Sequence, residues 1–186
     1  VNDAPVADVQ EVTTDEDSDV SILLTGTDED GDALSYEVVT DPTHGSVTVT
    51  APAVLSYSPN TDYNGSDNFT FRVTDGTLSD TATVSITIAS VNDAPVVSGI
   101  SDQTVAEGSS FTVFDLDDHL TEVDGDGILW SFSGNDELTV AIDTDNMVTV
   151  MVPNENWNDS ETITFTATDD NTDGLTSSDA TVFTVT

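Results

Sequence analysis

The feature that most constrains this chain is an internal repeat. Residues 1–6 read VNDAPV and recur at residues 91–96. Further on, residues 58–77 (SPNTDYNGSDNFTFRVTDGT) align without gaps with residues 152–171 (VPNENWNDSETITFTATDDN). Self-similarity at a fixed period marks tandem copies of one structural unit. The sequence therefore predicts two homologous modules, at residues 1–90 and 91–186.

Hydrophobic patterning within each module is that of β-strands. Val84, Ile86 and Ile88 alternate with polar residues, which is the period of a half-buried strand, and no stretch keeps a helical period. Similar short runs occur at 20–24, 34–39, 47–49 and 69–73, separated by Gly, Asp, Asn and Pro. Strands of this length and spacing are typical of a Greek-key sandwich. We predict an all-β fold of two tandem seven-stranded β-sandwiches, with these core residues: Leu24, Tyr36, Tyr57, Phe69, Phe71, Val84, Phe111, Trp130, Phe132, Phe165 and Phe183.

The charge balance excludes several classes of partner. The chain has 37 acidic residues, no Lys and one basic residue, Arg72, for a net charge of -36. Nucleic acid needs cationic side chains on the protein and is excluded as a partner. No apolar run of about 18 residues exists, so no membrane insertion is expected. With no Cys, there is no disulfide or thiolate metal site.

The expected strand directions gather carboxylates at the ends of the sandwiches. Seven residues are predicted to meet where the base of module one faces the top of module two: Glu16, Asp67, Asn92, Asp93, Asp124, Asp126 and Asp169. Two like charges about 4 Å apart repel by roughly 4 kcal/mol at an effective dielectric near 20. A divalent cation would turn this repulsion into attraction. Ca²⁺ suits carboxylate and amide oxygens, whereas Zn²⁺ prefers His or Cys.

The same strand directions predict two incomplete sites at the outer ends. One comprises Asn2, Asp3, Asp28, Asp30 and Asp75, and the other comprises Glu107 and Glu161. Residues 28–32 are not an EF-hand, because Ala33 stands where that loop needs Gly and Val39 where it needs Glu. Most other acidic residues are interpreted as solvated surface.

The NDAPV linker, the DxDGD loop and the TDG strand end resemble the bacterial cadherin-like tandem repeats of very large secreted or surface proteins. The resemblance implies a cadherin/Ig-like sandwich and calcium shared between modules. It makes Glu16 the base ligand, Asp67 the base loop ligand, Asn92 and Asp93 the linker ligands, and the remaining ligands Asp124, Asp126 and Asp169. The sequence departs from the animal pattern in having fewer linker acids and no DRE triplet.

We predict a non-enzymatic, calcium-rigidified spacer and adhesion element of a secreted or bacterial cell-surface protein. Its partners would be neighbouring cadherin-like modules and a cell-surface protein or polysaccharide. The alternative is a calcium-dependent polysaccharide-binding module attached to a glycan-degrading enzyme or surface protein, and homophilic association is a third reading. Tyr63, Trp157 and Trp130 are the candidate sugar-stacking rings, although Tyr63 and Trp157 are interpreted as plugs of the sandwich ends. His119 beside Asp118 is interpreted as an exposed loop residue rather than a catalytic one.

Overall fold

The computed structural model describes residues 1–154, 156–171 and 173–186. It divides into two compact units, Val1–Val91 and Asn92–Thr186, which are described separately below. Among the described residues, no helix is long and apolar enough to cross a membrane.

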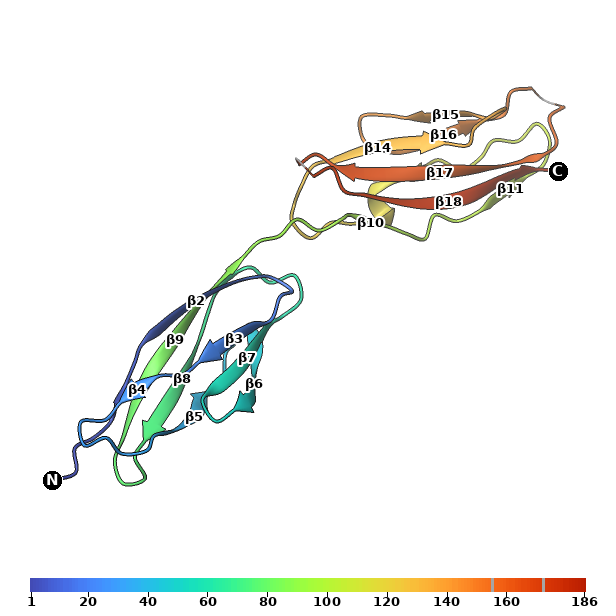
Figure 1. Ribbon diagram of the computed structural model, residues 1–186. Coiled ribbons are helices and arrows are strands. Elements are labelled where there is room, and N and C mark those ends of the chain that lie inside the picture. Colours follow the sequence, from blue (N-terminus) through green and yellow to red (C-terminus); the bar gives the residue numbers. More distant parts are fainter. Residues whose placement is uncertain (155, 172) are drawn as a thin grey trace. The chain divides into compact units, whose positions relative to one another are not determined.

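The first unit is a sandwich of two sheets (Figure 1). One has the order β2-β9-β8-β5 and the other β3-β7-β6, while β1 pairs with β4. The pairing of β2 with β9 is parallel, and the others are antiparallel. The strands are β1 Val6–Ala7, β2 Gln10–Asp15, β3 Val20–Leu23, β4 Gly26–Thr27, β5 Ser35–Thr40, β6 Gly45–Ala51, β7 Val54–Pro59, β8 Gly65–Thr74 and β9 Ser79–Ala89.

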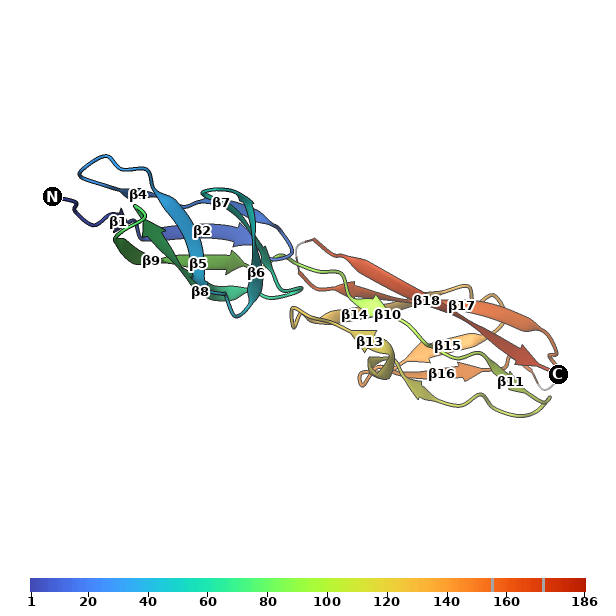
Figure 2. The same cartoon turned by 90° about the horizontal axis from the view of Figure 1, so that it is seen from below.

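The second unit repeats this arrangement. Its sheets have the orders β11-β18-β17-β14 and β12-β16-β15, β10 pairs with β13, and β11 runs parallel to β18. Figure 2 shows β17 and β18 in one layer and β15 and β16 in the other. The elements are β10 Val96–Val97, β11 Gln103–Val105, β12 Phe114–Asp115, the short 3-10 helix η1 Asp117–His119, β13 Leu120–Thr121, β14 Ile128–Ser133, β15 Thr139–Ile142, β16 Met147–Met151, β17 Ser160–Asp169 and β18 Thr176–Val185.

Each unit has the strand plan of a seven-stranded sandwich. In the first unit, β1 with β2 and β3 with β4 are the two parts of interrupted strands, and β10 with β11 and β12 with β13 play the same roles in the second. The prediction of an all-β chain built of two sandwich repeats is confirmed.

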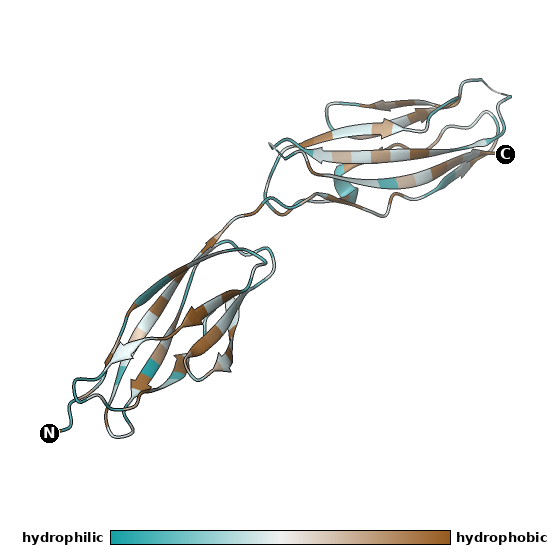
Figure 3. Cartoon of the chain, in the orientation of Figure 1, coloured by the Kyte–Doolittle hydropathy of each residue, from teal (hydrophilic) through white to brown (hydrophobic). Residues whose placement is uncertain are grey.

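The predicted alternation decides which side chains enter the core of the first unit. Val84, Ile86 and Ile88 of β9 are at most 3% exposed, and Phe69 and Phe71 of β8 are fully buried. Brown and pale bands alternate along the strands in Figure 3 for this reason. Burying a side chain of this size stabilises the fold by about 1.5–3 kcal/mol. The other predicted core residues, Leu24, Tyr57 and Tyr36, also pack in this cluster, although Tyr36 is only partly buried.

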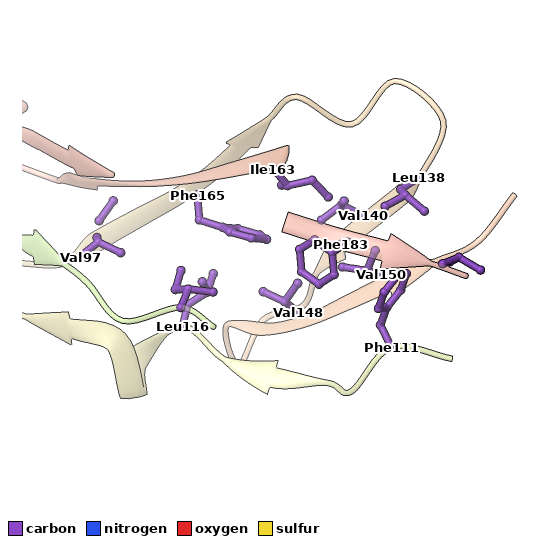
Figure 4. Close-up of a cluster of buried hydrophobic side chains, with 13 residues drawn as sticks. Val97, Phe111, Leu116, Leu138, Val140, Val148, Val150, Ile163, Phe165 and Phe183 are labelled. Atoms are coloured by element: carbon purple, nitrogen blue, oxygen red, sulfur yellow. The ribbon is translucent and has the colours of Figure 1, made fainter. Parts of the chain in front are cut away.

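The core of the second unit is built around three phenylalanines. Figure 4 shows Phe165 and Phe183, both fully buried, among aliphatic side chains from both sheets. Phe111 meets Phe183 edge to face, with ring centroids 5.1 Å apart. Trp130 and Phe132, predicted as core residues, are only partly buried and pack against this cluster.

One local prediction is wrong. Asp67 was expected to lie in a loop at the base of module one, but β8 begins at Gly65 and Asp67 pairs with Ile86 of β9. Gly, Ser, Asp and Asn have low strand propensity, so the sequence here gives little sign of a strand. The ladder to β9 overrides that local preference.

Candidate metal centres

The loop between β4 and β5 folds around its first aspartate. Asp28 Oδ1 accepts hydrogen bonds from the backbone N–H of Asp30 (3.0 Å) and of Asp32 (3.1 Å). Gly31 has a φ of +80°, a left-handed conformation that favours glycine. The folded loop brings one carboxylate oxygen each of Asp28, Asp30 and Asp32 within 4.8 Å of one another.

The N-terminal segment is fastened to this loop and to the β8–β9 turn. The Asp3 N–H donates to Asp30 Oδ2 at 2.7 Å, and Asn2 Nδ2 donates to Asp75 Oδ2 at 2.8 Å. Asp75 also accepts bonds from the N–H groups of Leu78 and Thr77. These donors, with that of Asn2, lower the pKa of Asp75 to about 2. We call Asn2, Asp3, Asp28, Asp30, Asp32 and Asp75 the first entry cluster.

The second unit builds the same arrangement from its own residues. The Asp93 N–H donates to Asp124 Oδ2 at 2.7 Å, and Asn92 Nδ2 donates to Asp169 Oδ2 at 3.0 Å. Within the β13–β14 loop, Glu122 Oε1 accepts the Asp124 N–H at 2.8 Å. Glu122 therefore occupies the position in this loop that Asp28 occupies in the first unit.

Three carboxylates again come together in this loop. Glu122, Asp124 and Asp126 each offer an oxygen within 4.8 Å of the other two. Asn171 donates to Asp126 Oδ2 at 2.9 Å and also to Asn92. We call Asn92, Asp93, Glu122, Asp124, Asp126 and Asp169 the second entry cluster.

One oxygen in each cluster is buried without a hydrogen bond. Asp28 Oδ2 and Glu122 Oε2 are out of solvent, and neither has a hydrogen-bond partner among the residues that the structure describes. Leaving a charged acceptor buried and unpaired costs more than the roughly 1–3 kcal/mol of a neutral group. Arg72, the one Arg of a chain without Lys, does not offset this cost, because in the described structure it pairs with Glu37. A bound cation would offset it.

Aligning the two clusters changes the ligand set expected from sequence. From the sequence, we expected Asp28 and Asp30 in the first unit and Asp124 and Asp126 in the second. These two pairs do not occupy equivalent positions. Asp30 corresponds to Asp124, because Asp30 accepts the Asp3 N–H as Asp124 accepts the Asp93 N–H. Sequence reasoning therefore missed Asp32 and Glu122 as candidate ligands. Superposing the two copies on their Asp-Gly dipeptides, 30–31 and 124–125, would have revealed both.

Glu16 and Glu107 hold equivalent positions at the other end of each unit. The Glu16 N–H donates to Ala89 O at 2.9 Å and the Glu107 N–H donates to Thr186 O at 3.1 Å. Glu16 is buried, and its Oε1 accepts the Val91 N–H at 2.7 Å. The Glu107 side chain is exposed.

Both carboxylate oxygens of Asp67 already accept hydrogen bonds from the protein itself. Oδ1 accepts the N–H of Thr43 (3.0 Å) and of Asn68 (2.8 Å), and Oδ2 accepts the His44 N–H (2.9 Å) and the Tyr57 hydroxyl (2.8 Å). Burial alone would raise the pKa of Asp67, but these bonds outweigh it and lower the pKa. Burial and the bond to Asp67 raise the pKa of Tyr57. We leave Asp67 outside the candidate ligands, because a cation would have to displace these donors.

Glu161 has the corresponding role in the second unit. Its two oxygens accept the backbone N–H groups of Glu137 and Leu138, in the loop between β14 and β15. Asp67 and Glu161, both expected from sequence to be ligands, thus act as clamps that fasten a loop to the start of the following long strand. We leave Glu161 outside the candidate ligands for the same reason.

The Asp67 clamp predicts a pH dependence. The folded pKa of Asp67 lies below its unfolded value, about 3.9. Its contribution to stability is therefore present above about pH 4 and lost as the pH falls through the folded pKa. Urea unfolding of the first unit, compared between wild type and Asp67→Asn, should show a stability difference that is constant above pH 5 and shrinks below pH 4. A difference that stays constant down to pH 2 would contradict this assignment.

The candidate sugar-stacking rings are partly buried. Tyr63 lies face to face with His44, with centroids 4.0 Å apart, and packs against the core of the first unit. Trp157 and Trp130 pack against the core of the second. For Tyr63 and Trp157, this packing agrees with the interpretation that each ring covers one end of its sandwich core.

The strand order, the parallel first-to-last pairing and the two-layer core define each unit as an immunoglobulin-like sandwich. The chain belongs to the family of bacterial Ig domains, whose model matches residues 2–87 and 92–186. Over 116 residues, or 61% of the chain, it is 32% identical to chitinase A of Pseudoalteromonas piscicida, and it spans 14% of that protein.

Solved structures with the same fold include cadherins. The extracellular cadherin domains 3–6 of protocadherin gamma B2 match 98% of the chain at 15% identity and a TM-score of 0.62. Drosophila N-cadherin EC1-4 matches the whole chain at 16% identity and a TM-score of 0.59. The chain spans about half the length of each of these structures, 47% and 50%. The resemblance to cadherin-like tandem repeats stated from the sequence is confirmed at the level of fold.

Proposed function

We propose that each unit binds calcium through its entry cluster, and that the chain serves as a calcium-stiffened module pair of a secreted or surface protein. The observation that carries this proposal is the pair of buried oxygens, Asp28 Oδ2 and Glu122 Oε2, which recur at equivalent positions without a partner in the described chain. Two more carboxylates lie beside each of them.

The donor set favours Ca²⁺ over other common ions. Carboxylate and amide oxygens are hard ligands, and Ca²⁺ accepts 6–8 of them at variable geometry. Mg²⁺ demands a tighter octahedron, and Zn²⁺ would favour His or Cys, which neither cluster contains. Extracellular modules of this kind bind calcium with dissociation constants of about 10⁻⁴–10⁻³ M.

Ion binding would remove a strain built into each cluster. Without a cation, the three carboxylates of each cluster, whose oxygens lie within 4.8 Å of one another, repel. The segment that leads into each unit is then held by individual hydrogen bonds, such as that from the Asp3 N–H to Asp30. With a cation, the same carboxylates attract a common centre, so the entering segment and the loop are tied together. The segment that leads into each unit would then move less relative to that unit. The prediction that Glu16 joins Asn92, Asp93 and Asp169 rests on strand directions and stays a prediction, as does a ligand role for Glu107.

Calorimetric titration of the full chain with CaCl₂ tests the proposal. We expect binding at both clusters, and we expect Asp28→Asn and Glu122→Gln each to weaken one class of site at least tenfold. Each substitution replaces a carboxylate that has a buried, unpartnered oxygen with a neutral amide. Calcium affinity should fall because the negative charge that the ion offsets is removed.

The matched control is Asp41→Asn, an exposed carboxylate outside both clusters. Its titration should equal that of the wild type. No measurable heat at millimolar calcium, or an equal loss in the control, would refute the proposal.

A second candidate function is binding of a polysaccharide, which the similarity to chitinase A favours. The chain would then be a non-catalytic accessory module. Pull-down on insoluble chitin, with and without chelator, distinguishes the two functions. Retention on chitin would support the second, and calcium binding without retention would leave the spacer function alone.

A further inference from the structure

The two entry clusters differ at an equivalent position. The repeat aligns Thr77 in the β8–β9 turn with Asn171 in the β17–β18 turn. The Thr77 hydroxyl accepts the side-chain N–H of Asn2 at 3.3 Å and donates to Asp75 at 3.0 Å. In the described part of the first unit, no hydrogen bond joins the loop of residues 28–33 to the turn of residues 75–78.

Asn171 does make such a connection in the second unit. Its Nδ2 donates to the Asn92 side chain and, at 2.9 Å, to Asp126 Oδ2. Its Oδ1 accepts the Asp173 N–H at 2.9 Å, which fixes the amide with its N–H groups toward the cluster. Asn171 thus ties both the segment that leads into the unit and the β13–β14 loop to the β17–β18 turn.

A second pair of bonds fastens the same loop to the same turn. Asp170 Oδ1 accepts the Gly127 N–H at 3.0 Å, and the Asp170 N–H donates to Gly127 O at 2.8 Å. A Cβ at residue 127 would lie 2.5 Å from Asp170 Oδ2, so this close approach requires glycine. The equivalent residues of the first unit are Ala33 and Gly76. Gly76 has no side chain to accept such a bond, and its N–H donates to Thr74 Oγ1 in its own turn.

Charge alone does not separate the two clusters, because each loop and turn offers the same number of carboxylates. What differs is how the carboxylates are held before an ion arrives. The corresponding groups are Asp28, Asp30, Asp32 and Asp75 in the first unit and Glu122, Asp124, Asp126 and Asp169 in the second.

We propose that Asn171 and Asp170 are positioning residues that preorganise the second entry cluster, so that it takes up calcium at a concentration roughly tenfold lower than the first cluster needs. This inference rests on the calcium binding proposed above. At intermediate calcium, the second cluster is then filled while the first is empty. The chain therefore gains its stiffness in two steps as calcium rises.

The physical reason is the cost of ordering the ligands. A site whose ligands are already held in place loses less conformational freedom when the ion binds. Hydrogen bonds that orient ligating carboxylates act in this way, and removing one typically weakens metal binding about 10–100-fold. The Asn171 amide is neutral, so it holds Asp126 without cancelling the charge that attracts the ion.

A site-resolved calcium titration of the full chain tests the proposal. Gly31 and Gly125 lie in the two loops, so their amide NMR resonances report on the two clusters separately. When CaCl₂ is added to the chelator-treated protein, Gly125 should reach its midpoint at roughly tenfold lower free calcium than Gly31. Before calcium is added, heteronuclear NOE values should be higher for residues 122–127 than for residues 28–33.

The outcomes separate this inference from the function on which it rests. Equal midpoints at the two glycines would overturn the inference and leave calcium binding intact. No response at either glycine up to millimolar calcium would refute both.

Asn171→Thr gives the second unit the residue of the first and leaves every carboxylate in place. The Gly125 midpoint should rise about tenfold or more, toward that of Gly31, and the Gly31 midpoint should not change. A purely structural role would lower the stability of the second unit in chelator without moving its calcium midpoint, and that result would overturn the proposal. A lower midpoint would also overturn it, because the amide would then compete with the ion.

The matched control is Asn158→Thr, an exposed asparagine before the start of β17. Both calcium midpoints should equal those of the wild type. If the control raised the Gly125 midpoint as much as Asn171→Thr, the effect would not be specific to the amide and the proposal would be wrong.

Asp170 supplies a second test if Asn171→Thr fails to fold. Asp170→Gly introduces the residue of the first unit and removes the acceptor for the Gly127 N–H, so the Gly125 midpoint should rise. Asp170→Asn removes the charge but keeps an acceptor oxygen, so its midpoint should stay close to that of the wild type. An equal rise in both variants would assign the effect to charge and contradict the proposal.

Discussion

Replacing Asp67 with alanine should destabilise the first unit by roughly 3–4 kcal/mol. The substitution removes the acceptor for the buried Tyr57 hydroxyl and for backbone N–H groups of the loop before β6. Each buried donor left without a partner costs about 1–3 kcal/mol. Because Tyr57 is fully buried, water cannot replace the carboxylate at its hydroxyl without entering the core.

The chain allows the two units to be followed separately. All three tyrosines lie in the first unit, and both tryptophans lie in the second. Urea unfolding monitored by tyrosine absorbance should shift to lower urea in Asp67→Ala, whereas tryptophan fluorescence should report an unchanged transition. Tyr57→Phe should cost less, about 1 kcal/mol, because it removes one donor and leaves the backbone bonds of Asp67.

Asp41→Ala is the control for loss of a negative charge in the same loop. Asp41 is exposed, so the change should stay within about 0.5 kcal/mol. If Asp41→Ala and Asp67→Ala lowered the tyrosine transition equally, charge rather than the clamp would explain the loss. The clamp assignment would then be wrong.

Calcium should raise the melting temperature of both units by roughly 10–20 °C at 100 times the dissociation constant. At that concentration one site stabilises the folded state by about 2.7 kcal/mol, and in domains of this size each kcal/mol shifts the melting temperature by about 4–8 °C. Chelation should reverse the shift.

Substitutions in one cluster should affect one optical signal. Asp30→Asn should remove the calcium-dependent shift seen by tyrosine, and Asp124→Asn the shift seen by tryptophan, because each lies in a different entry cluster. Sodium chloride at matched ionic strength is the control for general screening of the net charge. An equal shift with sodium, or a calcium shift that survives both substitutions, would contradict a specific site.

The repeat and the strand pattern were predictable because both are local in sequence. The alternation of Val84, Ile86 and Ile88 needs only the two-residue period of a strand, and it matches their burial. The gathering of Asn2, Asp30 and Asp75 followed from strand directions alone. The start of β8 did not, since Asp67 and its neighbours are poor strand formers.

The carboxylates could not be sorted by residue type. Asp28, Asp67 and Asp75 look alike in sequence, but their hydrogen bonding differs. Asp67 accepts hydrogen bonds from four residues, and Asp75 accepts one from the Asn2 side chain. Asp28 keeps one buried oxygen without a hydrogen-bond partner in the described chain. What separates them is which donors the fold brings near. Those donors come from distant parts of the chain, such as Thr43 and Tyr57 for Asp67.

The extent of β12 follows the same logic. Thr112 and Val113 correspond to Val20 and Ser21, which are paired in β3, yet β12 begins only at Phe114. The side chain of Gln103 instead takes both backbone groups of Thr112. The sequence by itself determined two β-sandwich repeats with acidic ends, because periodicity and turn chemistry act over a few residues. The tertiary structure decided which acids accept hydrogen bonds from the protein and where β12 begins to pair, because hydrogen-bond partners distant in sequence make those choices.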